Sequence, residues 1–283
     1  MTGTAVGFVG LGNIGKPMAL RLTQQAQASG GLSLAVYDVT PDPLAELEAA
    51  GAAVAGSVAE LSAGVDVLCV MVRDDDQVRD VLGQALGSAR DGLVVVVHST
   101  VAPQTPRQLE ITAGKHGVLL VDAPVSGGAM GAADGTLAIM VGGTDEAFAA
   151  ARPALDALGS KVIHAGAIGA GTRFKLARNM MHFISFAAAT EAQRLAEAAG
   201  LDLRALGDVV RHTDAITGGP GAIMHRETAA PIEDGDFWMG VFSHVADLGE
   251  KDLRFATELG ESLGVDTPLA DLALRRLRTG LGL

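Results

Sequence analysis

Short apolar runs rich in β-branched residues alternate with segments of helical periodicity over about the first 165 residues. This alternation predicts βαβ units around a mostly parallel sheet. Most of the runs are apolar throughout, as expected of strands that are covered on both faces. We expect strands over residues 5–9, 34–37, 65–72, 93–98, 117–121 and 137–141, with residues 161–164 as a seventh candidate.

From about residue 168 onward the pattern is helical only. A long helix is expected over residues 170–199, because this segment is rich in Ala, Leu, Met and Glu and Gly200 is placed to end it. Shorter helices are expected over residues 203–211, 243–263 and 268–278, with a loop at the Gly/Pro-rich residues 217–221.

These patterns predict an α/β fold with two domains. Residues 1–167 would form a doubly wound, mostly parallel sheet with helices, and residues 168–283 an all-helical domain. The long helix would join the two domains, and we expect a ligand-binding cleft at their junction.

Composition excludes several classes of protein. The chain of 283 residues has one cysteine, Cys69, so a disulfide framework is excluded and a reducing cytoplasm is expected. Lys and Arg number 21 against 33 Asp and Glu, a net charge of −12, and no basic run could follow a phosphate backbone. No window approaches the roughly 18 apolar residues of a membrane span. We therefore expect neither a nucleic-acid nor a membrane partner, and we find no pattern that predicts a metal site.

A glycine motif follows the first predicted strand directly and opens a helix. Gly10 permits the tight turn, Gly12 lets backbone amides approach a pyrophosphate, and Gly15 lets the helix pack closely on the strand. The unpaired amides at the helix start favour an anion. The motif therefore predicts a Rossmann-like dinucleotide site at Gly10, Leu11, Gly12, Asn13, Ile14 and Gly15.

The second predicted strand ends in Asp38, 23 residues after Gly15. This spacing is typical of an acid that accepts hydrogen bonds from the adenosine ribose. The carboxylate should repel a 2′-phosphate, and no Arg or Lys follows in the next four residues, so NAD is favoured and NADP is the alternative. A structural alternative is that Asp38 caps the turn before Pro41.

Two further segments carry candidate chemistry. Ser126 is followed by Gly127 and Gly128, whose exposed amides beside a hydroxyl could hold a substrate carboxylate; the alternative is an ordinary glycine-rich loop. At the start of the long helix, Lys175 and Asn179 are one turn apart on one face, where they could bind an oxygen that gains or loses a proton. The alternative is a surface helical lysine.

In their order and spacing, the motifs resemble the β-hydroxyacid dehydrogenase family, which includes 3-hydroxyisobutyrate dehydrogenase and tartronate semialdehyde reductase. The resemblance spans nearly the whole chain. It is carried by residues 7–18, 99–103 and 122–128, by Gly171 with Lys175 and Asn179, and by residues 251–253.

For the substrate, the resemblance implies that Ser126 and Gly127, with Gly128 beside them, hold the carboxylate. Lys175 would be the catalytic acid or base, and Asn179 would bind the substrate beside it. In oxidation Lys175 must be neutral to accept the hydroxyl proton. Its pKa would therefore have to be lowered by burial or by a nearby cation.

For the cofactor, the resemblance implies that Thr100 lies near the nicotinamide and that Val72 and Arg73 touch the dinucleotide. Lys251 would reach the cofactor or substrate from the helical domain, although a Lys–Asp pair on an amphipathic helix is usually a solvated face.

We therefore expect an NAD-dependent oxidoreductase that acts on a small 3-hydroxy acid similar to 3-hydroxyisobutyrate, or on its semialdehyde, and assembles as a homodimer or homotetramer. A tartronate semialdehyde reductase and a 4-hydroxybutyrate-type dehydrogenase stay open. An imine reductase, which should carry Asp or Tyr in place of Lys175, and a non-catalytic dinucleotide-binding scaffold are weaker alternatives. Trp238 is interpreted as core packing, whereas Phe242 and His244 receive no role.

Overall fold

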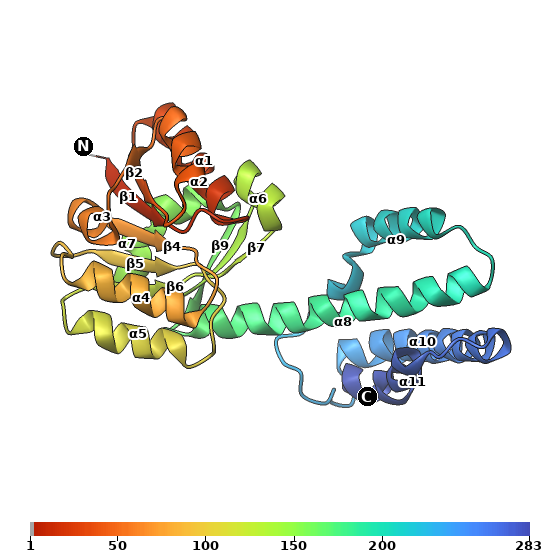
Figure 1. The fold of residues 1–283 in the computed structure, drawn as a ribbon. Helices are drawn as coiled ribbons and strands as arrows, with labels where there is room; N and C mark the ends of the chain where they lie inside the picture. Colours follow the sequence, from red (N-terminus) through yellow and green to blue (C-terminus); the bar gives the residue numbers. More distant parts are fainter. Residues whose placement is uncertain (1–2) are drawn as a thin grey trace. The chain divides into compact units, whose positions relative to one another are not determined.

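The computed structural model describes residues 3–283 (Figure 1). One sheet runs through its first part. Its strands are β1 (Thr4–Val9), β2 (Leu32–Tyr37), β3 (Ala53–Val54), β4 (Val67–Val70), β5 (Val94–Val97), β6 (Leu119–Asp122), β7 (Val125–Ser126), β8 (Ala138–Gly142) and β9 (Lys161–Gly166). All seven predicted strands are present, so the predicted alternation is confirmed.

The strand order is β3-β2-β1-β4-β5-β6-β8-β7, with β9 beside β8. Strands β1 to β6 pair in parallel, whereas β8 runs antiparallel to β6 and β7 and parallel to β9. The order reverses at β1, which is the doubly wound, Rossmann-like arrangement. The sequence analysis missed β3 and β7, because two-residue strands carry no hydrophobic periodicity.

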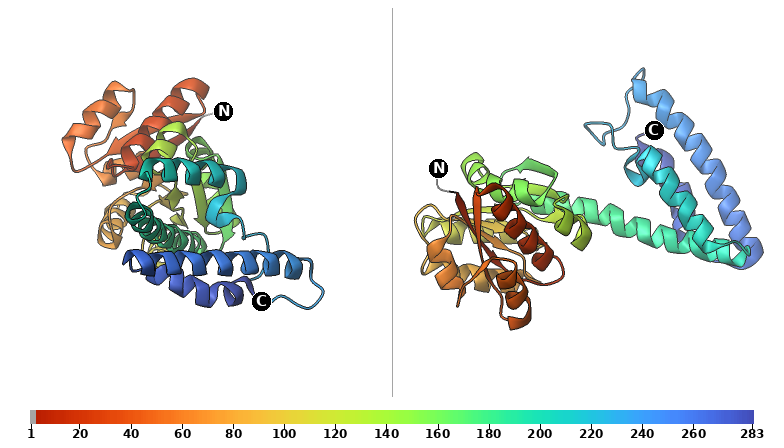
Figure 2. Two further views of the ribbon diagram at one scale, coloured as in Figure 1. Left: turned by 90° about the vertical axis from the view of Figure 1, so that its right-hand side faces the viewer. Right: turned by 90° about the horizontal axis from the view of Figure 1, so that it is seen from above.

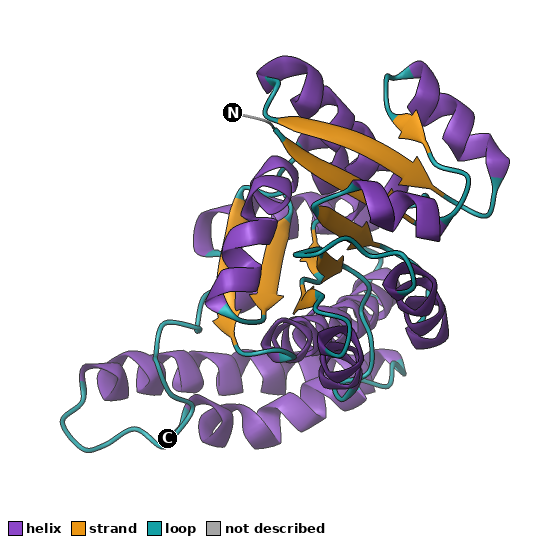
Figure 3. Cartoon of the chain, turned by 90° about the vertical axis from the view of Figure 1, so that its left-hand side faces the viewer, coloured by secondary structure: helices purple, strands orange, loops and turns teal. Residues whose placement is uncertain are grey.

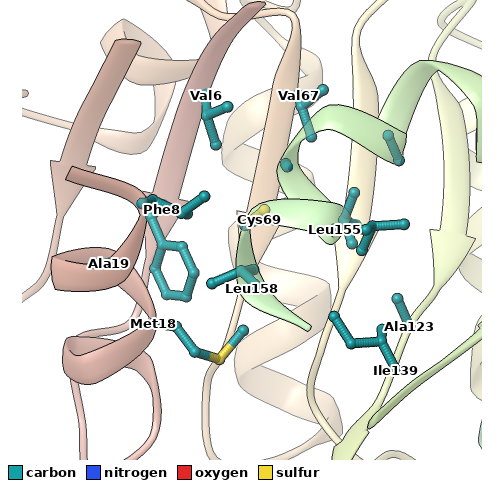
Figure 4. Packing of buried hydrophobic residues seen from close by; sticks show 14 of the residues in the cluster. Val6, Phe8, Met18, Ala19, Val67, Cys69, Ala123, Ile139, Leu155 and Leu158 are labelled. Atoms are coloured by element: carbon teal, nitrogen blue, oxygen red, sulfur yellow. The ribbon is translucent and has the colours of Figure 1, made fainter. Parts of the chain in front are cut away.

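Helices cover both faces of this sheet (Figure 3). They are α1 (Gly15–Ser29), α2 (Pro41–Ala49), α3 (Val58–Gly64), α4 (Asp75–Leu86), α5 (Thr105–Gly114), α6 (Gly128–Asp134) and α7 (Asp145–Leu158). Alternate residues of a strand face opposite sides. Accordingly Val94 and Val96 of β5 join one core, packed against α1 and α7, and Val95 and Val97 join the other, packed against α3, α4 and α5. Figure 4 shows the first core, in which Phe8 lies near Met18.

The turn between β1 and α1 depends on two glycines. Gly10 has a φ of 95°, a conformation that favours glycine. A Cβ atom on Gly15 would collide with the carbonyl oxygen of Gly10, so the helix can begin this close to the strand only without a side chain there. This close packing is the role that the sequence analysis predicted for Gly15.

The remaining helices are α8 (Ala170–Ala198), α9 (Leu203–Thr217), α10 (Phe237–Leu263) and α11 (Pro268–Leu281), with a short 3-10 turn at Gly219–Gly221. The chain divides into a first compact unit that extends to Arg178 and a second over Asn179–Leu283, so the boundary falls inside α8. The division of roles at residue 167 stays a prediction. Helix α10 begins six residues before the expected Ser243, because the Asp236 side chain accepts a hydrogen bond from Trp238 N and caps it.

The second unit has a small core. Helices α10 and α11 run side by side (Figures 1 and 2) and bury Phe242 and Leu281, against which Trp238 packs. The interpretation of Trp238 as core packing therefore agrees with the structure. Helix α9, in contrast, buries none of its side chains against the described residues 3–283. Across the same residues, no helix combines the length and apolarity that crossing a membrane requires.

Candidate active site

A cavity of about 810 Å³ lies in the first unit where β1, β2 and β4 end. Ligands of doubly wound sheets bind at this carboxyl edge, beside the point where the strand order reverses. The volume is within the range of small-molecule and cofactor sites. The sequence-predicted residues in its lining are Gly10, Leu11, Gly12, Asn13, Asp38, Val72 and Arg73.

Asp38 connects the glycine turn to the end of β2. Its Oδ2 accepts a hydrogen bond from Leu11 N at 2.6 Å, and its Oδ1 accepts one from Thr40 N at 2.8 Å. The second contact is the turn-capping role that the sequence left as an alternative. Each carboxylate oxygen has a further lone pair, so capping does not prevent Asp38 from accepting ribose hydroxyls as well.

The basic side chains of the cavity already have acidic partners. Lys16 Nζ lies 2.8 Å from Glu46 Oε2, and Arg73 Nε lies 2.9 Å from Asp74 Oδ2. Asp42 and Asp80 add negative charge to the lining. The lining around Asp38 and Lys16 therefore suits a diol better than a phosphate.

Ser99 fixes the segment after β4, and the sequence analysis gave it no role. Its hydroxyl donates to Val72 O at 2.8 Å and accepts from Val72 N at 2.9 Å. This reciprocal pair holds one of the predicted cofactor-binding residues in place. Thr100, next along the chain, is exposed and does not line the cavity.

Lys175 lies in the first two turns of α8 and is 8% exposed. Its Nζ donates hydrogen bonds to Val125 O and to Ser126 Oγ, the second over 2.8 Å. The alternative of a surface helical lysine is wrong, because the ammonium is buried against another segment of the chain. Burial, and secondly the charge of Arg178, lower the pKa of Lys175 to about 8.

The segment that receives Lys175 ends in two glycines with positive φ. Gly127 has a φ of 137° and Gly128 a φ of 64°, and both are exposed. Ser126, at the end of β7, is partly buried. A hydroxyl and two accessible backbone amides therefore lie next to the lysine, a donor set that fits a carboxylate.

Gly171, in the first turn of α8, packs directly against the backbone of the sheet. A Cβ atom there would collide with the carbonyl oxygens of Met140 and Asp122, because the first turn of α8 lies directly on β6 and β8. The same contact region holds Asp122, whose carboxylate the sequence analysis overlooked. The signal that could have found it is an acidic residue within an otherwise apolar strand segment.

Most of the predicted site residues thus form two groups within the first unit, the cavity lining and the Lys175–Ser126 cluster. Thr100 lies in neither group, and Asn179 and Lys251 belong to the second unit. Ile14 and Gly15 support the turn beside the cavity without lining it. Asn179 follows Lys175 by one turn of α8. Lys251 is exposed on α10 and lies 3.1 Å from Asp252, so its role toward a ligand stays a prediction.

Comparison with known proteins yields two family models. Residues 5–166 match the NAD binding domain of 6-phosphogluconate dehydrogenase, and residues 169–281 match the NAD-binding domain of NADP-dependent 3-hydroxyisobutyrate dehydrogenase. Together the two models cover nearly the whole chain and indicate an NAD(P)-dependent oxidoreductase.

The individual relatives are likewise described as oxidoreductases or dehydrogenases. A solved structure from Mycobacterium avium, described as an oxidoreductase, is 50% identical with a TM-score of 0.93 and covers 98% of each chain. The 3-hydroxyisobutyrate dehydrogenase of Mycobacterium tuberculosis, solved with L-serine, is 32% identical with a TM-score of 0.68 over 99% of this chain and 96% of its own. An NAD-dependent L-serine dehydrogenase of Pseudomonas aeruginosa is 34% identical over 286 residues, covering 96% of this chain and 91% of the relative.

Proposed function

The chain belongs to the β-hydroxyacid dehydrogenase family, and we propose that it transfers hydride between NAD and a small 3-hydroxy acid or its semialdehyde, with Lys175 as general acid and base. The observation that carries this proposal is the buried Lys175 Nζ, hydrogen-bonded to Val125 O and Ser126 Oγ. A lysine with a pKa near 8 can both accept and return a proton close to neutral pH.

The contacts of Lys175 suit both directions of proton transfer. A neutral amine has two N–H hydrogens and one lone pair. With the hydrogens donated to Val125 O and Ser126 Oγ, the lone pair is free to take the proton of a substrate hydroxyl. In the ammonium form the third N–H protonates the oxygen of a carbonyl as it is reduced.

Ser126 and the glycines after it bind the carboxylate in this proposal. Ser126 Oγ accepts its hydrogen bond from Lys175, so its own O–H is available to donate. The amides of Gly127 and Gly128 add donors, and Asn179 would hold the substrate beside Lys175. An acid with its hydroxyl close to its carboxylate is therefore favoured.

The nicotinamide dinucleotide supplies the hydride carrier when it is bound. Of the predicted residues, Gly10, Leu11, Gly12, Asn13, Asp38, Val72 and Arg73 line the cavity and would hold it, with Ile14 and Gly15 supporting the turn. Thr100 and Lys251, which lie outside the lining, would complete the proposed set. We propose NAD as the preferred form, because Asp38 lines the cavity and Lys16 is already paired with Glu46. The model that matches the helical part is that of an NADP-dependent enzyme, so NADP is the alternative to test.

Among substrates, the relatives favour acids with a hydroxyl on the third carbon. L-Serine and 3-hydroxyisobutyrate, which occur in the names of the relatives, both have this arrangement. Tartronate semialdehyde, its reduced product and 4-hydroxybutyrate remain second candidates. We further propose that the enzyme works in the reducing cytoplasm, because a chain with one cysteine, Cys69, cannot have a disulfide framework.

We also propose that the chain assembles as a homodimer or homotetramer. On α9, Val209 is 60% exposed and Ile216 is 72% exposed, and no side chain of this helix is buried within residues 3–283. An amphipathic helix needs a cover for its apolar face. A second copy of this chain is the one partner that is always present at matching abundance.

A substrate screen tests the function. NAD and NADP are each combined with 3-hydroxyisobutyrate, L-serine, glycerate, 3-hydroxypropionate and 4-hydroxybutyrate, and the reduced cofactors with tartronate and succinate semialdehydes, while absorbance of the reduced nicotinamide is followed. Preferential turnover of one short 3-hydroxy acid with NAD is expected. Binding of NADH without turnover of any of these compounds would contradict the proposed substrate class.

A further inference from the structure

Asp122, the last residue of β6, has a fully buried carboxylate. Its Oδ1 accepts a hydrogen bond from Gly169 N at 2.7 Å, and its Oδ2 accepts one from Thr172 N at 2.6 Å. The first amides of a helix have no partner within the helix. Asp122 therefore caps the start of α8 from a position about 50 residues earlier in the chain.

Where side chains cap other helices of the same unit, at α3, α4 and α7, the caps are local. Asp74 caps α4 by accepting from Gln77 N, and Thr144 caps α7 by accepting from Ala147 N. Only a local residue is needed to satisfy a helix end. The distant cap on α8 does something a local cap cannot, because it joins the helix to the strand that leads into the Val125–Ser126 segment.

This segment is fixed from its other side as well. The Nδ1 atom of His98 lies 2.9 Å from Ala123 O, and the ring is fully buried. Burial lowers the pKa of His98 to about 4, so the ring is neutral and Nδ1 donates the hydrogen. The backbone on which Val125 and Ser126 lie is thus tied to β5 as well as to α8.

One carboxylate therefore connects the helix that carries Lys175 to the segment that accepts its hydrogen bonds. Asp122 binds the helix that carries Lys175, and it is three residues before Val125 in the segment that accepts the lysine hydrogens. Burying this group has a cost, since desolvation raises the pKa of Asp122 despite its backbone donors. A purely structural cap could be exposed and local, as Asp74 is.

We propose that Asp122 is a positioning residue of the reaction: by binding the amides of Gly169 and Thr172 it holds Lys175 in its desolvated contact with Val125 O and Ser126 Oγ. The inference rests on the proposed role of Lys175 as acid and base. A displacement of a reacting group by about 1 Å can reduce a rate on the order of 100-fold.

Asp122→Asn is the sharpest test, because it keeps the shape of the side chain. The amide offers one acceptor oxygen, and its NH2 group faces one of the two backbone donors. The first turn of α8 should shift while the dinucleotide cavity is untouched, since Asp122 is not part of its lining. Thr144→Ala is the matched control, because it removes the side-chain cap of α7, a different helix of the same unit.

Two readouts separate positioning from stability. The first is the rate at which an amine-reactive reagent labels Lys175 as a function of pH, followed by mass spectrometry, which reports the pKa of Lys175 without any turnover. The second is the pH profile of kcat/KM. In Asp122→Asn we expect the pKa of Lys175 to rise by about one unit toward its ordinary value and kcat/KM to fall about 100-fold. NADH affinity should stay within about twofold, because the cavity is a separate site.

Thr144→Ala should lower the melting temperature and leave the pKa of Lys175 unchanged. If the pKa of Lys175 in Asp122→Asn equals that in the wild type, the proposal is overturned, whether or not activity is lost. If Asp122→Asn does not fold, Asp122→Glu decides by the same criterion, since it keeps the charge and both acceptor oxygens but moves them by one methylene relative to Gly169 N and Thr172 N. If the pKa of Lys175 rises in Asp122→Asn but the wild type turns over no hydroxy acid, the positioning role is supported and the proposed substrate is rejected.

Discussion

Lys175 Nζ donates a hydrogen bond to Ser126 Oγ over 2.8 Å, which joins α8 to β7. The group proposed to move the proton and the group proposed to bind the carboxylate are therefore in direct contact. A substrate that uses both must carry its hydroxyl and its carboxylate a few bonds apart. This relationship favours short 3-hydroxy acids over larger alcohols.

Replacing Lys175 should abolish proton transfer while leaving the cofactor site intact. Lys175→Met fills a similar volume without an ionisable group, and we expect kcat/KM to fall on the order of 1,000-fold in both directions. Lys175→Arg is the matched variant that keeps the charge but cannot deprotonate, so it should also be inactive. NADH binding, measured by fluorescence titration, should be retained in both. Near-normal turnover of either variant would remove Lys175 from the mechanism.

The pH dependence should follow the state of Lys175. Its pKa is lowered to about 8 by burial, so the amine is neutral above this pH and charged below it. Oxidation needs the neutral form, and kcat/KM for the hydroxy acid should rise with pH and level off above about 8. Reduction needs the ammonium and should fall over the same range. Steady-state kinetics in both directions would test the opposite signs, and two profiles of the same sign would contradict the assignment.

Substitution of two glycines in the dinucleotide turn should have different effects, one on stability and the other on cofactor binding. A Cβ on Gly15 would meet Gly10 O, so Gly15→Ala should destabilise the protein and lower its melting temperature. A Cβ on Gly12 would meet no atom within 4 Å, so Gly12→Ala should keep the stability of the wild type. It should nevertheless weaken NADH binding, because the added methyl group lies where a pyrophosphate approaches. Equal effects of the two variants on melting temperature would contradict this division.

Cofactor preference should depend on Asp38 and on the exposed position after it. Asp38→Ala removes the ribose acceptor and the contact to Leu11 N, and Val39→Arg, at a position 88% exposed, adds a cation for a 2′-phosphate. The double variant should shift the ratio of kcat/KM for NAD over NADP by roughly 10- to 100-fold toward NADP, the value of one hydrogen bond to a charged group. Val39→Arg alone is the control. A wild type that already prefers NADP would disprove the ribose argument.

Much of this fold could be predicted from the sequence, because apolar periodicity and glycine placement are local signals. The runs that became β1, β4 and β5 are apolar on both faces, and the helix start at Gly15 follows from its motif. The C-terminal end of α9 and the start of α10 were not predicted, whereas the start of α9 and the C-terminal end of α10 were. The two ends that were missed depend on the caps Gly218 and Asp236, which lie in segments that resemble loops.

The site could be predicted only in part, for a physical reason. Lys175 and Ser126 have recognisable surroundings in the sequence, but their contact joins residues 49 positions apart. Asp122 acts through the backbone amides of Gly169 and Thr172. Because every residue except proline has such an amide, the sequence does not indicate which ones will be donors. The close approach of Gly171 to Met140 O likewise appears only once the strand and helix are in place.

The apolar face of α9 should be covered in solution. Light scattering coupled to size-exclusion chromatography should give a mass of two or four chains at micromolar concentration. Ile216→Glu places a charge on a residue that is 72% exposed in the single chain, and it should shift the mass toward one chain because a buried charge opposes association. Arg204→Glu, on the polar face of the same helix, is the control and should leave the mass unchanged. A monomeric wild type would contradict the proposed assembly, because the apolar face of α9 would then be stable without a second copy.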